Sequence, residues 1–534
     1  MKLPGMGGAS LSRSVQTVFG GFDRRSAAGD GSLRDMENLT GAEFPLLAVR
    51  PPRRILGSLS SPNGLFCAGE TLCYVDGCDF YYGGSIKGRV SDSPKVFAAL
   101  GRRILIWPDK VCYDPEEDSL LPLESSVTCP TETLRFADGS IYGEEAAANC
   151  IYSDTMHLAD YFRVGDCIRI SGCSTVPENN KEVIIREISE DGRALYCYEY
   201  SFTLPEGESR YSEQGLVTLA REVPDLDFLC VNENRVWGCK GDSIRGCKLG
   251  DPTNWNVFDG LSTDSYALDA GSAGDFTGCA AYLGYPTFFK EGQIYKLYGS
   301  VPSNFELLSS ASTGVAAGSG QSIAVAGETL YYLASSGPVA YAGGSPASVA
   351  AAFAGARLRN GLAGSDGRRW YLNAEEESGL RQLFVYDTGT GLWHREDSLA
   401  AAFFARMGDR LYCLTEEGQL LLLGDTRGEV LGQEEGSFSW FAEFGDFTGG
   451  TPDKKSLTRL LLRLEAEEGT QLQVLLRWDS GAWVQAAEVE AGPKRSVLLP
   501  ILPRRADQFC LRLEGEGPCR IHSLTREMRL GRER

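Results

Sequence analysis

The sequence predicts an all-β protein: a β-propeller of six or seven blades, an inserted small β-barrel and a C-terminal β-sandwich. Three observations predict it. One is a near-duplicate octapeptide, AGETLCYV from Ala68 and AGETLYYL from Ala326. Another is an alternating, aromatic-rich pattern whose copies mostly lie about 33 to 41 residues apart, the length of a four-stranded propeller blade. The last is a change after about residue 430 to longer strands separated by Gly-rich turns, which is the rhythm of a sandwich.

Each copy of the pattern places a short turn containing Gly or Asn before alternating large apolar residues. Alternation with period two, together with aromatic and β-branched residues, indicates β-hairpins. The octapeptide therefore recurs because it belongs to the same hairpin of two different blades. The copies are at 68–76, 100–109, 232–241, 290–299, 326–335, 366–375 and 407–416.

The long gap between the copies at 100 and 232 has room for a further domain. The stretch YFRVGDCIRISGC and a hairpin turning at Asp191-Gly192 predict a small barrel of about five or six strands. A loop between blades tolerates such an insertion because the entropy of loop closure rises slowly with length. The predicted domains are an N-terminal arm (1–54), the first blades (55–125), the barrel (126–225), the remaining blades (226–428) and the sandwich (429–534).

The N-terminal arm carries few periodic strands but many turn residues. We expect residues 14–54 to run along the surface or to complete a blade rather than to fold as a separate domain.

The composition is that of a globular protein with a strong acidic balance. Of the 534 residues, 43% are hydrophobic and 23% are charged, and the net charge is −20. No run of about 18 apolar residues occurs, and the N-terminus lacks an apolar core, so we expect neither a membrane span nor a secretory signal. An acidic chain repels phosphate backbones, which disfavours tight nucleic-acid binding.

The cysteines and glycines indicate no cofactor. None of the sixteen cysteines forms a C-x-x-C pair, and no His lies near the closest groups, so we expect reduced and mostly buried thiols rather than a zinc site. The Gly-rich stretches AGSAGDF and GVAAGSGQS lack the strand and helix setting of a phosphate-binding loop. We therefore expect no metal and no cofactor.

Catalytic motifs are also missing from the sequence. His157, His394 and His522 each stand alone in strand-like surroundings, without a neighbouring nucleophile. A sialidase-like S-x-D-x-G-x-x-W box is approached at Ser365, where SDGRRW lacks the spacer residue. Glycosidases need two carboxylates that flank the sugar, and 72 acidic residues allow no pair to be chosen. From the sequence we expect no catalytic residues and no enzymatic activity.

Four segments in a fixed order carry a family likeness: VFGGFDRR…GSLRDMENLTG…LAVRPPRR (18–54), the D-P-x-x-W-containing stretch NENRVWGCKGDSIRGCKLGDPTNWNVFDGLSTDSYALDAG (232–271), FFKEGQIYKLYGSVPSNFEL (288–307) and IHSLTREMRLGRER (521–534). Together they resemble phage tail nozzle (tail tubular) proteins and the tail-hub DNA-stabilisation proteins of short-tailed bacteriophages.

The resemblance implies a structural virion protein. Such a chain forms a ring, a homo-hexamer, around the DNA channel of the tail, as nozzle or hub, and retains and then conducts the genome. Its implied neighbours are portal and adaptor proteins and tail fibres or tail-tip proteins, with double-stranded DNA passing through the lumen without specific binding. Its implied location is the virion, after synthesis in the host bacterial cytoplasm.

For such a ring we predict an acidic channel lining, with basic residues kept for contacts between proteins; the alternative is that these arginines face the lumen and grip DNA. Two other functions stay open. A host-glycan depolymerase predicts a carboxylate pair in a cleft at the propeller mouth, and a receptor-binding module predicts an exposed aromatic groove on the sandwich. The candidate contact residues are Arg50, Arg53, Arg54, Arg526, Arg529, Arg532 and Arg534.

Overall fold

The computed structural model describes residues 10–138, 149–197, 202–426, 428, 430–451 and 453–530. Within these ranges the regular structure consists of β-strands and short 3-10 turns, which confirms the predicted all-β class. No helix in the described ranges has the length and apolar character needed to cross a membrane. The chain divides into two compact units, 1–76 with 315–534 and 77–314, and each is described by itself. The 3-10 turns are η2 (Leu158–Asp160), η3 (Pro177–Asn179), η4 (Pro302–Asn304), η5 (Gly320–Ser322) and η6 (Ala351–Phe353).

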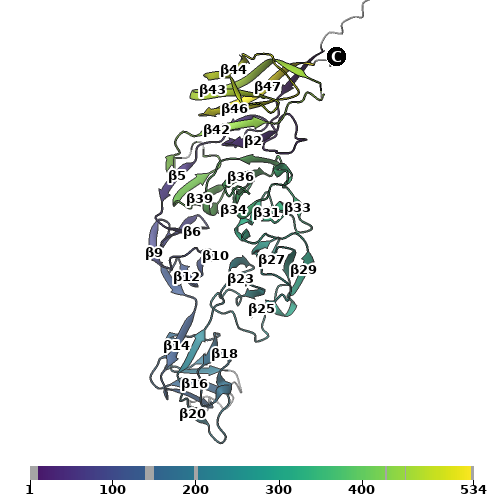
Figure 1. The fold of residues 1–534 in the computed structure, drawn as a ribbon. Coiled ribbons are helices and arrows are strands. Elements are labelled where there is room, and N and C mark those ends of the chain that lie inside the picture. Colours follow the sequence, from purple (N-terminus) through teal and green to yellow (C-terminus); the bar gives the residue numbers. More distant parts are fainter. Residues whose placement is uncertain are drawn as a thin grey trace, which may run out of the picture. The chain divides into compact units, whose positions relative to one another are not determined.

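The predicted propeller is confirmed, with seven blades, of which six have four strands and one has five (Figure 1). One blade has two strands in each unit: β6 (Pro62–Ala68), β7 (Thr71–Asp76), β8 (Asp79–Tyr82) and β9 (Ser85–Arg89). Three blades lie in unit 77–314: β10 (Val96–Leu100), β11 (Arg103–Trp107), β12 (Val111–Asp114) and β13 (Ser119–Pro122); β22 (Phe228–Asn232), β23 (Arg235–Lys240), β24 (Ser243–Gly246) and β25 (Tyr266–Asp269); β26 (Gly278–Tyr282), β27 (Tyr285–Lys290), β28 (Gln293–Tyr298) and β29 (Glu306–Ala311).

The other three blades belong to the unit that contains both ends of the chain. They are β30 (Ala324–Ala326), β31 (Thr329–Ala334), β32 (Gly337–Tyr341) and β33 (Ala347–Ser348); β34 (Arg359–Ser365), β35 (Arg369–Glu375), β36 (Arg381–Asp387) and β37 (Leu392–Arg395); and β38 (Ala401–Met407), β39 (Arg410–Thr415), β40 (Gln419–Leu423) and β5 (Arg54–Ser58), the last flanked by the two-residue β41 (Gln433–Glu434).

The repeated octapeptide forms the turn and second strand of its blade in both places. Gly69 and Gly327 lie in the tight turns before β7 and β31 with φ of 59° and 53°, a conformation that glycine adopts without a steric penalty. Four of the five other copies also fall on the second strand of their blade, but 290–299 does not, because its strand β28 is the third of its blade. The second strand there is β27.

A strand from the N-terminal part of the chain completes the last blade. β5 pairs antiparallel with β40, with Ile55 opposite Leu421, and Figure 1 shows this purple strand against the green strands of the blade. The blade is therefore built from residues more than 350 positions apart, and its stability depends on how firmly the segment before β5 is held.

The inserted domain is a single eight-stranded sheet that nearly closes as a barrel, rather than the five or six strands expected. Its interior is apolar, with Phe136, Ile168, Ile185, Leu195 and Leu219 fully buried. The strands are β14 (Ser125–Cys129), β15 (Leu134–Asp138), β16 (Asn149–Ser153), β17 (Cys167–Ser171), β18 (Glu182–Ile188), β19 (Ala194–Cys197), β20 (Arg210–Ser212) and β21 (Val217–Arg221).

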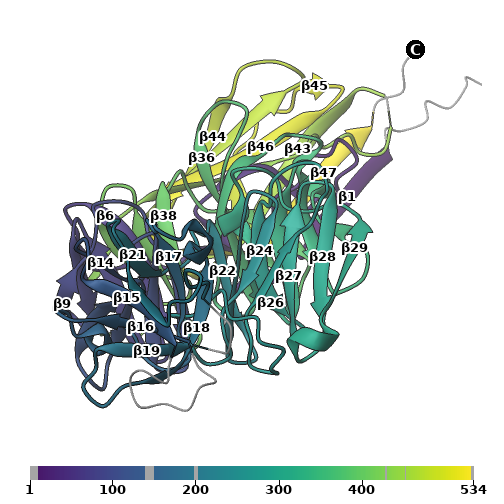
Figure 2. The ribbon, with the colours of Figure 1, turned by 90° about the horizontal axis from the view of Figure 1, so that it is seen from below.

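The C-terminal strands form one ten-stranded network that also includes the first four strands of the chain (Figure 2). Alternate residues of its longest strand, such as Leu460, Leu462, Leu464, Leu472 and Val474, are buried, as the period of a half-buried strand requires. The strands are β1 (Ser10–Gln16), β2 (Leu33–Glu37), β3 (Leu39–Thr40), β4 (Leu47–Val49), β42 (Ser439–Phe444), β43 (Lys455–Trp478), β44 (Val484–Leu499), β45 (Arg505–Ala506), β46 (Phe509–Glu516) and β47 (Cys519–Leu530).

Aromatic side chains of the N-terminal segment join this network to a blade of the same unit. Phe22 contacts Phe353 and Phe384, with ring centroids 5.6 and 5.8 Å away, and Phe19 contacts Phe444. Residues 10–58 thus contribute strands to the C-terminal sheet and to the last blade. The boundaries of the five predicted domains stay predictions.

Candidate functional site

Two of the predicted contact arginines, Arg50 and Arg53, are buried within their own unit, each 4% exposed. Nε of Arg50 donates a hydrogen bond to Oδ1 of Asn38 at 2.7 Å, and its Nη1 donates to a carboxylate oxygen of Glu435, also at 2.7 Å. The Arg50 guanidinium lies over the ring of Phe438, with Cζ 4.0 Å from the centroid. The charge of Arg50 is therefore matched inside the chain.

Arg53 contacts two consecutive carboxylates that follow β37. Its Nη1 donates to Oδ2 of Asp397 at 2.7 Å, and its Nη2 donates to Glu396 at 2.8 Å and to Oδ1 of Asp397 at 2.9 Å. Such two-pronged pairs are among the strongest in proteins, because both hydrogen bonds are charge-assisted. We call Arg50, Arg53, Glu396, Asp397 and Glu435 the arm network, since it ties the segment before β5 to the blade β34–β37.

Burial and charge act against each other on the carboxylates of the arm network. Burial alone would raise the pKa of Asp397, but the charges of Arg53 and Arg50 hold that pKa below its usual value. Burial would likewise raise the pKa of Glu435, and the hydrogen bond from Arg50 lowers it. Both groups are thus held ionised, and the arm network loses its pairing only in acid.

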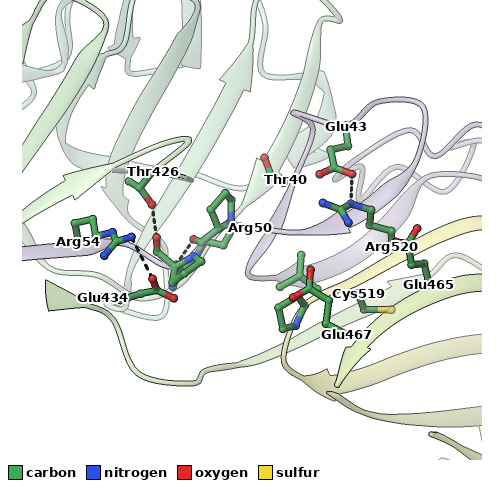
Figure 3. Close-up of a pocket in the computed structure, with 15 residues that line it drawn as sticks. Thr40, Glu43, Arg50, Arg54, Thr426, Glu434, Glu465, Glu467, Cys519 and Arg520 are labelled. Atoms are coloured by element: carbon green, nitrogen blue, oxygen red, sulfur yellow. Dashed lines mark hydrogen bonds and ion pairs between the residues drawn. The ribbon is translucent and has the colours of Figure 1, made fainter. Parts of the chain in front are cut away.

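The third predicted arginine, Arg54, lines a pocket of about 310 Å³ together with Arg50 (Figure 3). Arg54 pairs with Glu434 at 3.2 Å, and Arg520 donates to Glu43 at 2.6 Å on the other side of the pocket. The space is therefore lined by both carboxylates and guanidinium groups. The lining residues are Thr40, Glu43, Val49, Arg50, Pro51, Pro52, Arg54, Thr426, Gly428, Glu434, Glu465, Glu467, Pro518, Cys519 and Arg520.

The four C-terminal arginines have different surroundings. Arg526 is fully buried, donates to Asp30 at 2.6 Å and to Ser14 at 3.1 Å, and lies over the ring of Phe447. Arg529 is exposed on β47. Arg532 and Arg534 lie outside the described residues. Contact of the seven arginines with other proteins stays a prediction.

A second pocket, of about 360 Å³, lies at the turns of two blades and gathers four aspartates. Oδ2 of Asp366 accepts a hydrogen bond from Nε of Arg369 at 2.8 Å, and Asp387 pairs with Arg368 at 2.9 Å. Asp366 also receives two backbone N–H groups of its own turn, which fixes its carboxylate. We call this the aspartate pocket; its lining residues are Ala42, Asp366, Arg368, Arg369, Asp387, Asp409, Arg410, Leu422, Leu423, Gly424 and Asp425.

The aspartate pocket is a feature that the sequence argument missed. Its carboxylates come from the turns β34–β35, β36–β37 and β38–β39 and from the segment after β40, so they are up to 59 positions apart. Within any one blade, the spacing of these aspartates does not predict a pocket. The recurrence of Asp beside Arg in the turns DGRR and GDR is the one sequence feature that could have pointed to it.

A further cluster, also missed, joins the barrel to a blade loop within unit 77–314. Asn254, from the D-P-T-N-W stretch, donates to Oδ1 of Asp166 at 2.9 Å and accepts from the backbone N–H of Cys167 at 3.0 Å. Asp166 also pairs with Arg221 at 2.5 Å, and Asn254 donates to Asp251 at 2.8 Å. We call these residues the barrel anchor.

The three histidines have different surroundings in the part of the chain that the structure describes. His394 is buried, and burial lowers its pKa to about 4, so it is neutral at pH 7. His157 is exposed, and His522 lies 3.7 Å from Glu465. Among the described residues, no group of His, Cys, Asp and Glu is arranged to hold a metal ion.

Comparisons with known proteins identify no family. Neither a protein-family model nor a curated protein matches this chain. Solved structures similar to it include an exo-β-1,3-galactanase from Phanerochaete chrysosporium with galactose, at 10% identity and TM-score 0.19, covering 55% of this chain and 92% of the other. A putative 6-phosphogluconolactonase from Bacteroides uniformis has 14% identity and TM-score 0.27, covering 51% and 95%. A GH43 glycoside hydrolase engineered for endo-xylanase and exo-arabinofuranosidase activity has 10% identity and TM-score 0.20, covering 58% and 98%.

The expectation that the chain is not an enzyme is corrected by these comparisons. Solved glycoside hydrolases are among the structures similar to it, and the fold gathers carboxylates in a pocket where the sequence offered no selectable pair. We therefore withdraw the exclusion of enzymatic activity. Since the TM-scores are below 0.5, the likeness carries no argument for a particular reaction.

Proposed function

We propose that the chain is a structural virion protein of a phage tail, a nozzle or hub ring that surrounds the DNA channel, retains the genome and then conducts it. The proposal starts from the four ordered segments that resemble tail nozzle and tail-hub proteins. Its neighbours would be portal or adaptor proteins and tail fibres or tail-tip proteins.

One observation carries the proposal: the arginine-rich segment 50–54 is neutralised within the chain. Arg53 is paired with Glu396 and Asp397, and Arg54 with Glu434. A conduit for DNA must not hold it, because each contact between a basic side chain and a phosphate releases counterions and adds affinity. With −20 per chain, six copies carry a charge on the order of −120 before counterions screen it.

Native mass spectrometry and negative-stain imaging of the purified chain test the ring. We expect sixfold rings, and a chain that stays monomeric over the whole concentration range would contradict the proposal.

Filter binding to duplex DNA at about 150 mM salt tests the conduit, since phosphate contacts are weakened but still measurable there. We expect no binding at micromolar concentrations of protein. A dissociation constant in the micromolar range or below would refute the passive conduit. Glu434→Lys, which removes the partner of Arg54 and adds a charge, is the matched control and should raise the DNA affinity.

A second candidate function, binding or depolymerising a host glycan, is favoured by the aspartate pocket. Asp–Arg pairs held by a rigid turn offer fixed donors and acceptors to sugar hydroxyl groups, and hydrolysis needs carboxylates on both sides of the scissile bond. Screening of the intact protein on immobilised bacterial glycans, with an assay for new reducing ends, tests it. Asp409→Asn should weaken binding or turnover, and Asp160→Asn, an exposed barrel residue, should not.

A further inference from the structure

Three thiols lie together between two neighbouring blades of unit 77–314. Cys230 is on β22, Cys239 is on β23 of the same blade, and Cys279 is on β26, the first strand of the next blade. Cys230 is opposite Trp237 in the β22–β23 pair, so Cys239, two residues further, has its side chain on the same face of the sheet. Topology therefore brings all three to one layer between the blades.

Cys279 is the common member of this thiol cluster. Its strand, β26, packs against β22, the strand of Cys230. Cys279 lies in one buried cluster with Cys239, and Cys230 packs against that cluster. The surroundings are apolar, with Trp237, Phe276 and Phe288 in the same buried cluster. Two cysteines on strands that pack against each other have the placement from which a disulfide can form.

The ionisation of the thiols is suppressed. The hydrogen bond from Cys279 and burial raise the pKa of Cys230 well above its usual value. For Cys279, the bond with Cys230 lowers the pKa, but the bond with Cys239 and burial raise it further, so the result is also well above normal. Little thiolate exists at neutral pH, and the thiolate is the reactive form. Oxidation of this cluster is therefore slow at neutral pH.

Two observations favour disulfide formation over metal binding and indicate Cys230 and Cys279 as the pair. In the residues that the structure describes, no set of side chains is arranged to hold a metal ion, so ligation does not account for the cluster. Cys230 is partly exposed, whereas Cys239 is fully buried. An oxidant reaches Cys230 first, and Cys279 is the cysteine on β26, the strand that packs against the strand of Cys230.

We propose that Cys230 and Cys279 form a redox-sensitive staple between the blades β22–β25 and β26–β29. A two-electron oxidant of the diazene class converts the two thiols to one disulfide. The Sγ–Sγ bond forms, both S–H bonds break, and the two protons and two electrons pass to the N=N bond, giving a hydrazine. The staple joins blades that hydrogen bonds within each sheet do not connect, and it does not depend on the proposed tail function.

The test uses the intact protein, oxidised with diamide at pH 8 and digested with trypsin without reduction. Trypsin separates the three cysteines into peptides 222–235, 236–240 and 249–290. We expect 222–235 to be linked to 249–290, with a mass lower by about 2 Da than the sum of the two free peptides because two hydrogens are lost. The link should disappear on treatment with dithiothreitol. A link between 236–240 and 249–290, or no link after overnight exposure, would overturn the proposal.

Variants separate the staple from general thiol oxidation. Cys279→Ser should abolish the link and Cys239→Ser should keep it. Cys413→Ser, which removes a buried thiol of another blade, is the matched control and should also keep it. In the unaltered chain, oxidation should raise the thermal midpoint, and dithiothreitol should reverse the shift. The same shift in Cys279→Ser would overturn the assignment.

Discussion

The side-chain amide of Asn254 lies between the barrel and a propeller blade, with Nδ2 2.9 Å from Oδ1 of Asp166. Both residues are almost fully buried, and the Asn254 oxygen accepts the N–H of Cys167 at the start of β17. A buried amide that uses both of its ends fixes the orientation of the segments it joins, because leaving either end unpaired costs free energy. The D-P-T-N-W stretch thus has a structural role: it holds the inserted barrel.

Asn254→Ala should release this hold. The change leaves Oδ1 of Asp166 and the N–H of Cys167 without their buried partner, at a cost of about 2 to 4 kcal/mol. Hydrogen exchange of β17 should become faster, and the urea midpoint of the unit should fall. Asn256→Ala is the matched control, because Asn256 makes only a 3.5 Å contact with Glu182. Equal exchange rates in the two variants would contradict the role of the barrel anchor.

The propeller could be predicted from local sequence patterns, whereas the pairing of residues far apart in the chain could not. The turn at Gly69 and the strand after it are specified by neighbouring residues, so a hairpin can be read directly. The pairing of Leu47 with Ile521, or of Arg53 with Asp397, joins parts of the chain that no local rule connects. In a chain with 72 acidic residues, any arginine has many possible partners.

The candidate site could be predicted only in part, because its members also come from distant parts of the chain. Arginines in 50–54 could be selected as functional by their density, but not the carboxylates that neutralise them. The aspartate pocket was missed because its members come from separate turns, and the barrel was assigned too few strands because short strands such as β20 (Arg210–Ser212) lack a clear period.

Gly41→Ala should destabilise the protein through His394. A Cβ at position 41 would lie 2.5 Å from Cε1 of His394, which is closer than real contacts allow. Because the buried imidazole has little room to move, the expected cost is about 1 to 3 kcal/mol, typical of overpacking. Gly29→Ala is the matched control, since nothing lies within 4 Å of the added Cβ. Thermal unfolding compares the two, and equal midpoints would contradict the close approach.

His394 should also make stability depend on pH. Burial lowers its pKa in the folded state from 6.5 to about 4, so the unfolded chain binds the proton first. Stability is fully present above about pH 6.5 and is lost as the pH falls toward 4, by on the order of 3 kcal/mol. Urea titrations from pH 7.5 to 4.5 measure the loss. His394→Gln should flatten the profile and His157→Gln should not; a profile unchanged by His394→Gln would refute this assignment.

The arm network should control how firmly β5 completes the last blade. Arg53→Leu leaves Glu396 and Asp397 buried without their guanidinium partner, and removing one member of a buried pair costs about 3 to 5 kcal/mol. Arg54→Leu removes a pair whose carboxylate, on Glu434, is 55% exposed, so its cost should be below about 1 kcal/mol. Hydrogen exchange of β5 and β40, with urea unfolding, compares the two variants.

Acid should have the same effect on the unaltered arm network as Arg53→Leu. The pKa values of Asp397 and Glu435 are held below their usual range, so the stability they contribute is present above about pH 4.5 and is lost as the pH falls through the lowered values. Exchange of β5 should therefore become faster in acid in the unaltered chain, while Arg53→Leu should already exchange fast at pH 7 and change less. If Arg53→Leu and Arg54→Leu lost equal stability, the arm network would not be what holds β5 in the blade.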